Sequence, residues 1–190
     1  MFEKIISSIG AALDERRIPY MLIGGQAVLL YGEPRLTRDI DITLGVDVNK
    51  LADVVSLAQD LQFKMLPDCI EDFVRETMVL PVLHEETGIR IDFIFSFSLY
   101  ERQAIAQARK VRLTDRDVNF AAPEDVIIHK IVAGRPRDLD DVRGILLKTP
   151  DLDLAYIRTW LADFSNALEE AEIKQRLETI LSTVSHLPER

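Results

Sequence analysis

The first 120 residues change repeatedly between a helical and a strand period of apolar side chains. Apolar residues at three- to four-residue spacing, ended by Pro19, predict an amphipathic helix over residues 2–17. Strict alternation with period two predicts a strand with one apolar face over residues 39–44. The same criteria predict further strands at 20–23, 79–84, 89–95, 111–113 and 118–120, and helices at 26–31, 49–61, 68–76 and 99–108.

Turn and cap residues give four local predictions. The pair Gly24-Gly25 predicts a tight turn between a strand and a helix, and Asn49 is expected to cap the helix that follows it. Residues 85–88 predict a hairpin connection, with Gly88 at positive φ. Because Pro81 has no N–H to give to a ladder, its strand is expected at an edge of the sheet.

From Pro123 onward the chain reads as helices only. Pro123 suits a first helical position, and helices are predicted at 124–133, 138–147, 154–168 and 170–183. The predicted fold class is therefore α+β: a small mixed sheet flanked by helices, followed by a helical C-terminal subdomain. The expected domains are residues 1–122 and 123–190.

Composition narrows the class of protein. The chain has 190 residues, of which 47% are hydrophobic, and 23 Lys and Arg stand against 32 Asp and Glu, a net charge of −9. This content disfavours disorder, and no stretch approaches the about 20 apolar residues of a membrane span. The N-terminus does not resemble a signal peptide, so we expect a cytoplasmic protein with no membrane partner. The acidic balance argues against broad capture of nucleic acid, but not against a nucleotide, because metal ions can invert the local charge.

Cysteine and histidine predict no metal site. The single cysteine, Cys69, excludes an intramolecular disulfide framework and a multi-cysteine zinc site, and we expect it to be a small buried hydrophobe. The three histidines are scattered without ligand spacing.

Aspartates on the predicted strands are the main candidates for chemistry. On a strand, Asp39 and Asp41 point to one face about 6.5–7 Å apart. Two like charges on one face cost stability unless a cation lies between them, and Mg²⁺ prefers carboxylate oxygens. Asp92 interrupts another apolar strand, and if the two strands are neighbours, three carboxylates converge. Such a group, holding one or two metal ions, can activate an attacking oxygen and polarise phosphate.

The glycine pair adds a candidate phosphate site. Gly24 and Gly25 precede a predicted helix, where glycines let the backbone approach a ligand and exposed N–H groups favour phosphate. A short link, which contains Arg35 and Arg38, then leads to Asp39. The spacing would therefore place a phosphate cradle beside a metal site.

These residues together carry a family resemblance. Gly24-Gly25, Arg35-x-Thr37-x-Asp39-x-Asp41 and the later Asp92 resemble the active-site pattern of the polymerase-beta-like nucleotidyltransferase superfamily. Within it, residues 123–141 resemble the AbiEii-like, abortive-infection branch, in which a lysine-bearing helix precedes an Arg-Asp-x-x-Asp sequence. The residues that match this second pattern are Lys130, Arg137, Asp138 and Asp141.

The resemblance implies transfer of a nucleoside monophosphate from an NTP to an acceptor hydroxyl or phosphate, with release of pyrophosphate. Asp39, Asp41 and Asp92 would be catalytic and would hold Mg²⁺ or Mn²⁺. The nucleotide-binding residues would be Gly24, Gly25, Arg38 and Lys130. Many superfamily members have serine after the first glycine, so Gly25 removes one side-chain contact to phosphate. The acceptor would be tRNA, a small molecule or a protein, and a toxin of this branch would have a cognate antitoxin.

Several alternatives stay open at the sequence level. Asp39 and Asp41 also fit a solvated strand face, and Asp92 fits a pair with Arg90. Lys130 also fits the surface of an amphipathic helix, and Arg35 and Arg38 suit either a carboxylate or a phosphate partner. The alternative function is a transferase-like scaffold that binds nucleotide or protein without catalysis, and a weaker one is a metal-dependent phosphohydrolase.

Overall fold

The computed structural model describes residues 1–96 and 98–185. The chain divides into two compact units, each of which draws on two stretches of sequence. The first consists of Met1–Gln26 and Leu36–Ala121, and the second of Ala27–Arg35 and Ala122–Arg190. The predicted domain boundary at 122 stays a prediction; in this division the helical unit also includes residues 27–35. The last five residues of the predicted C-terminal subdomain, 186–190, lie outside the described part.

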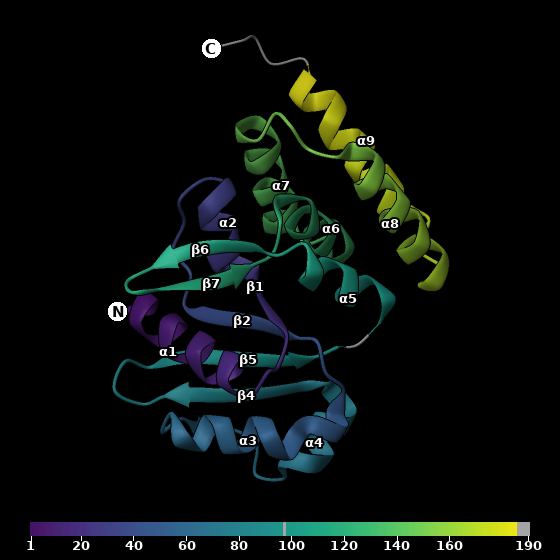
Figure 1. The fold of residues 1–190 in the computed structure, drawn as a ribbon. Helices are drawn as coiled ribbons and strands as arrows, with labels where there is room; N and C mark the ends of the chain where they lie inside the picture. The colour runs from purple at the N-terminus through teal and green to yellow at the C-terminus, as the bar shows by residue number, and fades with distance from the viewer. Residues whose placement is uncertain (97, 186–190) are drawn as a thin grey trace. The chain divides into compact units, whose positions relative to one another are not determined.

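A mixed sheet forms the centre of the first unit (Figure 1). Within the described residues it has seven strands, and the pairs β2–β5 and β1–β7 are parallel while the other neighbours are antiparallel. Their order is β3 (Lys64–Met65), β4 (Val79–His84), β5 (Ile89–Phe95), β2 (Asp39–Leu44), β1 (Tyr20–Ile23), β7 (Arg116–Phe120) and β6 (Arg109–Leu113). The predicted fold class is confirmed.

Period-two alternation explains the core of the sheet. Ile40 and Ile42 on β2 and Ile91 and Phe93 on β5 are fully buried on one face. The helices of this unit are α1 (Phe2–Glu15), the 3₁₀ helix η1 (Val48–Lys50), α3 (Leu51–Asp60), α4 (Ile70–Thr77) and α5 (Leu99–Ala106). Helix α1 contacts β6 and β7, whereas α3 contacts β3 and α4 contacts β4.

The described part of the second unit contains four complete helices. It also includes residues 27–35, of which residues 27–31 belong to α2 (Gly24–Tyr31). The four helices are α6 (Pro123–Ala133), α7 (Pro136–Lys148), α8 (Leu154–Ala167) and α9 (Glu172–Ser185). Pro123 and Pro136 open α6 and α7, where their missing N–H is no loss. Helices α6 and α9 each contact the other three helices of this group.

The predicted edge position of the Pro81 strand is wrong. Strand β4 lies between β5 and the two-residue strand β3, which the sequence analysis did not predict. The N–H of Leu66 donates to the carbonyl of Pro81 at 3.1 Å, but proline has no N–H to return the bond. Pro81 therefore ends the β3–β4 ladder, which pairs only Lys64 with Leu83 and Met65 with Val82.

Two further local predictions change. Asp47, and not Asn49, caps the helical turn after β2, because its side chain accepts a 2.8 Å hydrogen bond from the N–H of Asn49. Cys69 is exposed just before α4 rather than buried. In the part of the chain that the structure describes, no helix is long and apolar enough to cross a membrane.

Candidate active site

The three predicted carboxylates lie on two adjacent strands. Strands β2 and β5 are parallel, with Asp41 opposite Asp92 and Asp39 opposite Arg90. Because residues opposite each other in a sheet share a face, all four side chains leave the sheet on the same side. Across the other edge of β2, Asp41 is opposite Ile23 on β1. The two aspartate strands are therefore neighbours, which is the condition that the sequence analysis set for the three carboxylates to converge.

Gly24 makes room for the carboxylate of Asp41. Its φ is +63°, a left-handed conformation that a side chain disfavours. A Cβ at this position would lie 1.9 Å from Asp41 Oδ2, closer than any non-bonded contact allows. The Asp41 carboxylate thus rests against the backbone of the first residue of α2, and the next residue, Gly25, is buried. The glycine pair predicted from sequence and the β2 aspartate meet at one point.

The link before β2 orients Asp39. Asp39 is exposed, and its Oδ1 accepts hydrogen bonds from the hydroxyl of Thr37 at 3.4 Å and from the N–H of Arg38 at 3.3 Å. The side chain of Arg38 is exposed. The two residues before β2, Thr37 and Arg38, therefore both donate to the carboxylate of Asp39, the first residue of that strand.

Asp92 takes part in an ion pair. Arg90 Nε lies 2.8 Å from Asp92 Oδ1, and the side chains are 51% and 18% exposed, so the pair anticipated from sequence is formed. Among residues 1–96 and 98–185, no three His, Cys, Asp or Glu side chains stand together in a group ready to hold a metal ion. The oxygen donors and the strand register suit a hard cation. Binding one to all three carboxylates would require the side chains to reorient, with Asp92 turning from Arg90.

Lys130 is almost buried among ion pairs, so the alternative of a position on a helix surface is wrong. In the second unit its side chain is 9% exposed, and its ammonium lies 2.6 Å from Asp138 Oδ1 and 3.0 Å from Asp141 Oδ2. Burial alone would raise the pKa of Asp138, but hydrogen bonds from Arg135 and Lys130 outweigh it and hold the pKa of that carboxyl below its usual value. Arg137 is exposed.

Arg35 belongs to the same group of ion-paired side chains. This ion cluster consists of Arg35, Lys130, Arg135, Asp138 and Asp141. The Nε of Arg35 lies 2.9 Å from Asp141 Oδ1, and its Nη2 donates to Asp141 Oδ2 at 3.1 Å, which is the two-pronged geometry that arginine makes with carboxylates. Of the two roles that the sequence left open for Arg35, the structure shows the carboxylate partner. That partner lies 106 positions along the chain, so no local pattern could have revealed it.

Thr43 was missed by the sequence analysis. It continues the face of Asp39 and Asp41 at the same two-residue step, is 1% exposed, and has a hydroxyl without a hydrogen-bond partner among the described residues. The period-two pattern was the available signal, but threonine is so common in strands that the pattern did not single it out.

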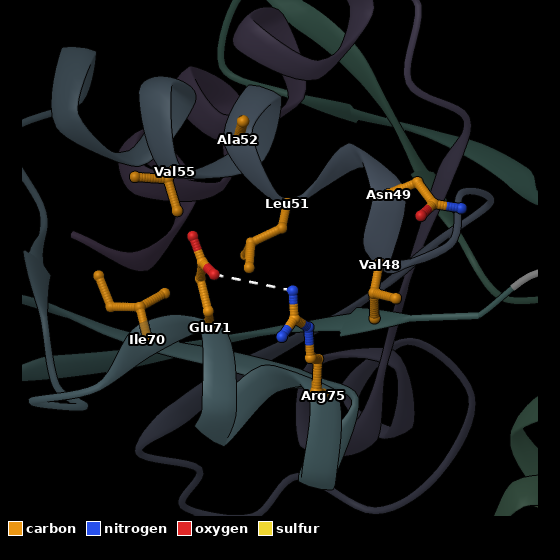
Figure 2. A pocket seen from close by; sticks show the side chains of 8 residues that line it. All are labelled: Val48, Asn49, Leu51, Ala52, Val55, Ile70, Glu71 and Arg75. Atoms are coloured by element: carbon orange, nitrogen blue, oxygen red, sulfur yellow. Dashed lines mark ion pairs between the residues drawn. The ribbon is translucent and has the colours of Figure 1, made fainter.

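A separate pocket in the first unit contains none of the predicted residues. Its volume is about 480 Å³, within the usual range for small-molecule sites, and aliphatic side chains of η1, α3 and α4 line it. Figure 2 shows Leu51 and Val55 of α3 on the side of this hollow opposite Glu71 and Arg75 of α4. Arg75 Nη2 lies 3.7 Å from Glu71 Oε2, so the two charged groups there face each other.

Sequence comparison decides the family. A family described as "Nucleotidyltransferase of unknown function (DUF6036)" matches residues 2–187. The chain belongs to this family. No curated protein matches the sequence. The predicted relation to nucleotidyltransferases is therefore confirmed at the level of this family.

Solved structures with the nucleotidyltransferase fold resemble the chain over most of its length. An antigenic nucleotidyltransferase-like protein from Paracoccidioides brasiliensis has a TM-score of 0.57 and 17% identity over 93% of this chain and 91% of that one. The antibiotic-resistance factor ANT(2'')-Ia has a TM-score of 0.55 and 16% identity, covering 97% and 95%. JHP933 from Helicobacter pylori has a TM-score of 0.51 and 17% identity, covering 96% and 89%. At these identities the likeness concerns the fold alone.

Proposed function

We propose that this nucleotidyltransferase-family chain is an active, metal-dependent enzyme. It transfers a nucleoside monophosphate from an NTP to an acceptor hydroxyl or phosphate and releases pyrophosphate. The observation that carries the proposal is the register of β2 and β5, which sets Asp41 opposite Asp92 with Asp39 on the same face. Three acids on one side of a sheet repel each other, and a divalent cation with a triphosphate would relieve that cost.

Each residue of the site has a chemical role in this proposal. Asp39 and Asp41 would hold Mg²⁺ or Mn²⁺ together with Asp92, and the metal would neutralise phosphate charge and favour in-line attack. Asp92, once turned from Arg90 towards the metal, would accept the proton of an acceptor hydroxyl at the carboxylate oxygen that does not hold the metal. The acceptor oxygen then forms a bond to the α-phosphorus as the bond to the pyrophosphate oxygen breaks. The backbone at Gly24 and Gly25 would approach the triphosphate closely, without a side chain in between.

The cationic residues contribute unequally. Arg38 is exposed one residue before Asp39, which supports the proposal that it binds nucleotide phosphate. Lys130 is almost buried and pairs with Asp138 and Asp141, which supports a structural role in neutralising these two carboxylates. Its contact with phosphate stays a prediction.

The Arg90–Asp92 pair favours one alternative. Because it gives Asp92 a structural partner, it fits a scaffold that binds nucleotide or protein without catalysis. Incubation with NTP labelled in both the nucleoside and the γ-phosphate separates the functions. Nucleoside label on an acceptor supports the transferase, free phosphate a phosphohydrolase, and no turnover the binding module.

Thermal unfolding tests the metal and nucleotide site. We expect Mg²⁺ with an NTP to raise the melting temperature of the wild-type chain, because a ligand at 100 times its Kd adds about 2.7 kcal/mol to stability. Asp41→Asn should remove that shift, and Asp92→Asn should lower turnover by about 100-fold or more. Asp117→Asn, which removes another strand aspartate paired with an arginine, is the matched control and should keep both properties.

Two outcomes of the unfolding experiment would contradict the proposed site. If metal with each of the four NTPs leaves the wild-type melting temperature unchanged and Asp41→Asn melts identically, the three aspartates are not a metal site. A shift retained in Asp41→Asn would place the nucleotide elsewhere.

The finer assignments stay predictions. They are the AbiEii-like branch, a toxin role with a cognate antitoxin, the cytoplasmic location, and the choice between tRNA, a small molecule and a protein as acceptor. Identification of the neighbouring gene, then mass spectrometry of RNA, small molecules and proteins after incubation with NTP, would test them.

A further inference from the structure

We propose that the hollow between α3 and α4 binds a free α-amino acid with a large apolar side chain. This hollow is the pocket of about 480 Å³ drawn in Figure 2, and all of its lining belongs to the first unit. It is separate from the proposed active site, because Asp39 begins β2 whereas the lining starts at Val48, four residues after β2 ends at Leu44. From Asp39 to Leu44 the strand spans about 17 Å. The proposal therefore does not depend on the proposed function.

Helix α3 is apolar on two adjoining sides. Val54 and Leu57 are fully buried, at 0% exposure, and form the side that packs in the core. Leu51 and Val55 occupy the next side, are only partly buried and line the hollow. A helix that packs on one core requires a single apolar stripe, so the second side is available for another contact.

The hollow gathers aliphatic side chains from three elements. Val48 of η1 and Ile70 of α4 join Leu51 and Val55 of α3, and all four are only partly buried. A ligand that enters a concave apolar site removes this surface from water, which favours binding in proportion to the apolar area that is covered. The ligand is therefore expected to carry a bulky aliphatic or aromatic group.

Two opposite charges stand beside this apolar surface. Glu71 and Arg75 project from α4 toward α3 (Figure 2), and Arg75 Nη2 lies 3.7 Å from Glu71 Oε2. This distance is longer than the about 2.7–2.9 Å of a charge-assisted hydrogen bond. The two side chains are 69% and 76% exposed, and exposed ion pairs contribute little to stability. A charged ligand can therefore come between them at little cost.

The charges and the apolar lining together define the class of ligand. A carboxylate suits the planar guanidinium of Arg75, which can bind it through two N–H groups, and an ammonium suits the carboxylate of Glu71. Because the two protein charges are only 3.7 Å apart, the two charges of the ligand must also be close together. An α-amino acid carries its ammonium and carboxylate on a single carbon. Its side chain would then extend over Leu51 and Val55.

Nuclear magnetic resonance of the ¹⁵N-labelled full chain measures binding and its location together. We expect L-phenylalanine and L-leucine to bind and to shift the amide signals of the residues that line the hollow. Two analogues separate the charges, since 3-phenylpropionate lacks the ammonium of phenylalanine and 2-phenylethylamine lacks its carboxylate. Each should bind about tenfold more weakly than L-phenylalanine, because each loses a hydrogen bond between charged groups.

Glu71→Gln and Arg75→Gln test the protein's two charges. Each should weaken the binding of L-phenylalanine about tenfold. In Glu71→Gln, L-phenylalanine and 3-phenylpropionate should bind with similar affinity, because the ammonium has lost its partner. Arg143→Gln is the matched control, since Arg143 forms an exposed pair with Asp140 on another helix, and it should bind as the wild type does.

Ala52→Trp tests the place of binding. Ala52 is exposed and lines the hollow, so an indole there would fill the hollow without disturbing the core. We expect L-phenylalanine binding to be lost in this variant. Ala155→Trp, which changes an exposed alanine of α8, should keep it. If Ala52→Trp did not fold, the two glutamine variants, which alter exposed side chains, would decide the proposal.

Each outcome supports or overturns the amino-acid site. Weaker binding of both analogues and loss of binding in Ala52→Trp support it. Absence of binding of both amino acids to the wild-type chain overturns it, as does equal binding of 3-phenylpropionate or binding retained in Ala52→Trp. Asp41→Asn should bind L-phenylalanine as the wild type does, and loss there would place the ligand at the proposed active site and overturn the inference. A missing thermal shift with Mg²⁺ and NTP contradicts only the proposed function.

Discussion

At the residue scale, the least replaceable position of the proposed site is a glycine. Gly24 combines a left-handed φ with the close approach of Asp41, so it satisfies two conditions that only glycine meets together. Many substitutions near Asp39 or Arg38 would leave the backbone in place. A side chain at Gly24 would move the carboxylate itself.

Gly24→Ala tests this conclusion against Gly88→Ala. Both glycines have φ between +60° and +70°, but a Cβ at Gly88 would meet nothing within 4 Å. We expect each variant to lose about 1–2 kcal/mol of unfolding free energy through its left-handed backbone. Only Gly24→Ala should also lose the thermal shift with Mg²⁺ and NTP. Retention of that shift would show that Asp41 does not need its present position.

At the element scale, helix termini are secured by side chains from distant segments. Helix α6 ends at Gly134, whose φ is +64°, and Arg176 of α9 donates to the Ile131 carbonyl at 3.1 Å. The last carbonyls of a helix lack partners within it, so the guanidinium satisfies one of them. The sequence analysis ended this helix at residue 133, one position before Gly134, but gave no sign of the arginine 42 positions after that glycine.

Gly134→Ala should therefore cost more than its backbone strain. A Cβ there would lie 2.5 Å from Arg176 Nη1, so the guanidinium must leave the α6 carbonyl. We expect a loss of about 2–3 kcal/mol in denaturant unfolding, from the left-handed residue and the lost hydrogen bond. In an Arg176→Gln background the same substitution should cost about 1–2 kcal/mol, the strain alone. Equal costs in the two backgrounds would contradict the capping role.

At the scale of the whole molecule, buried charge makes folding depend on acid pH. The pKa of Asp138 is held below its usual value in the folded chain, where burial raises it but the bonds from Arg135 and Lys130 lower it by more. The unfolded chain then binds the proton first, so stability is full above the unfolded pKa of about 4 and is lost as pH falls through the folded pKa.

Asp138→Asn measures this contribution. The variant should be less stable than wild type at neutral pH, and below pH 4 its stability should fall less steeply, by up to about 1.4 kcal/mol per pH unit. Asp140→Asn removes an exposed carboxylate of the same helix and should keep the wild-type slope. Equal slopes for all three chains in urea unfolding at pH 3 to 5 would show that Asp138 does not account for the acid sensitivity.

The net charge of −9 gains a clearer meaning from the structure. Three of its acids lie on one sheet face that the proposed function assigns to metal ions, and two more are neutralised inside the helical unit. The amino-acid composition could not show that Asp138 and Asp141 pair with Lys130 and arginine side chains. Because paired charges already cancel in a net sum, the surplus of nine negative charges lies outside this group of ion pairs.

The sequence by itself determined the elements and the residues of the proposed site. Apolar periodicity is a local property, so it located the β2 and β5 strands and the helices α6 to α9, and the glycine pair and Asp-x-Asp spacing named Gly24, Asp39 and Asp41. Strand β3 escaped because two residues are too short to show a period.

Only the tertiary structure decided which distant side chains meet. The pairing of Asp92 with Arg90 was open in the sequence, while the register of β2 on β5 and the hold of Asp141 on Arg35 depend on contacts between segments far apart in the chain. The helix pattern around Lys130 was equally compatible with a surface residue, a contact to phosphate and a buried ion pair. Periodicity records which face of an element is apolar, and the partner of a charged side chain is set by what packs against that face.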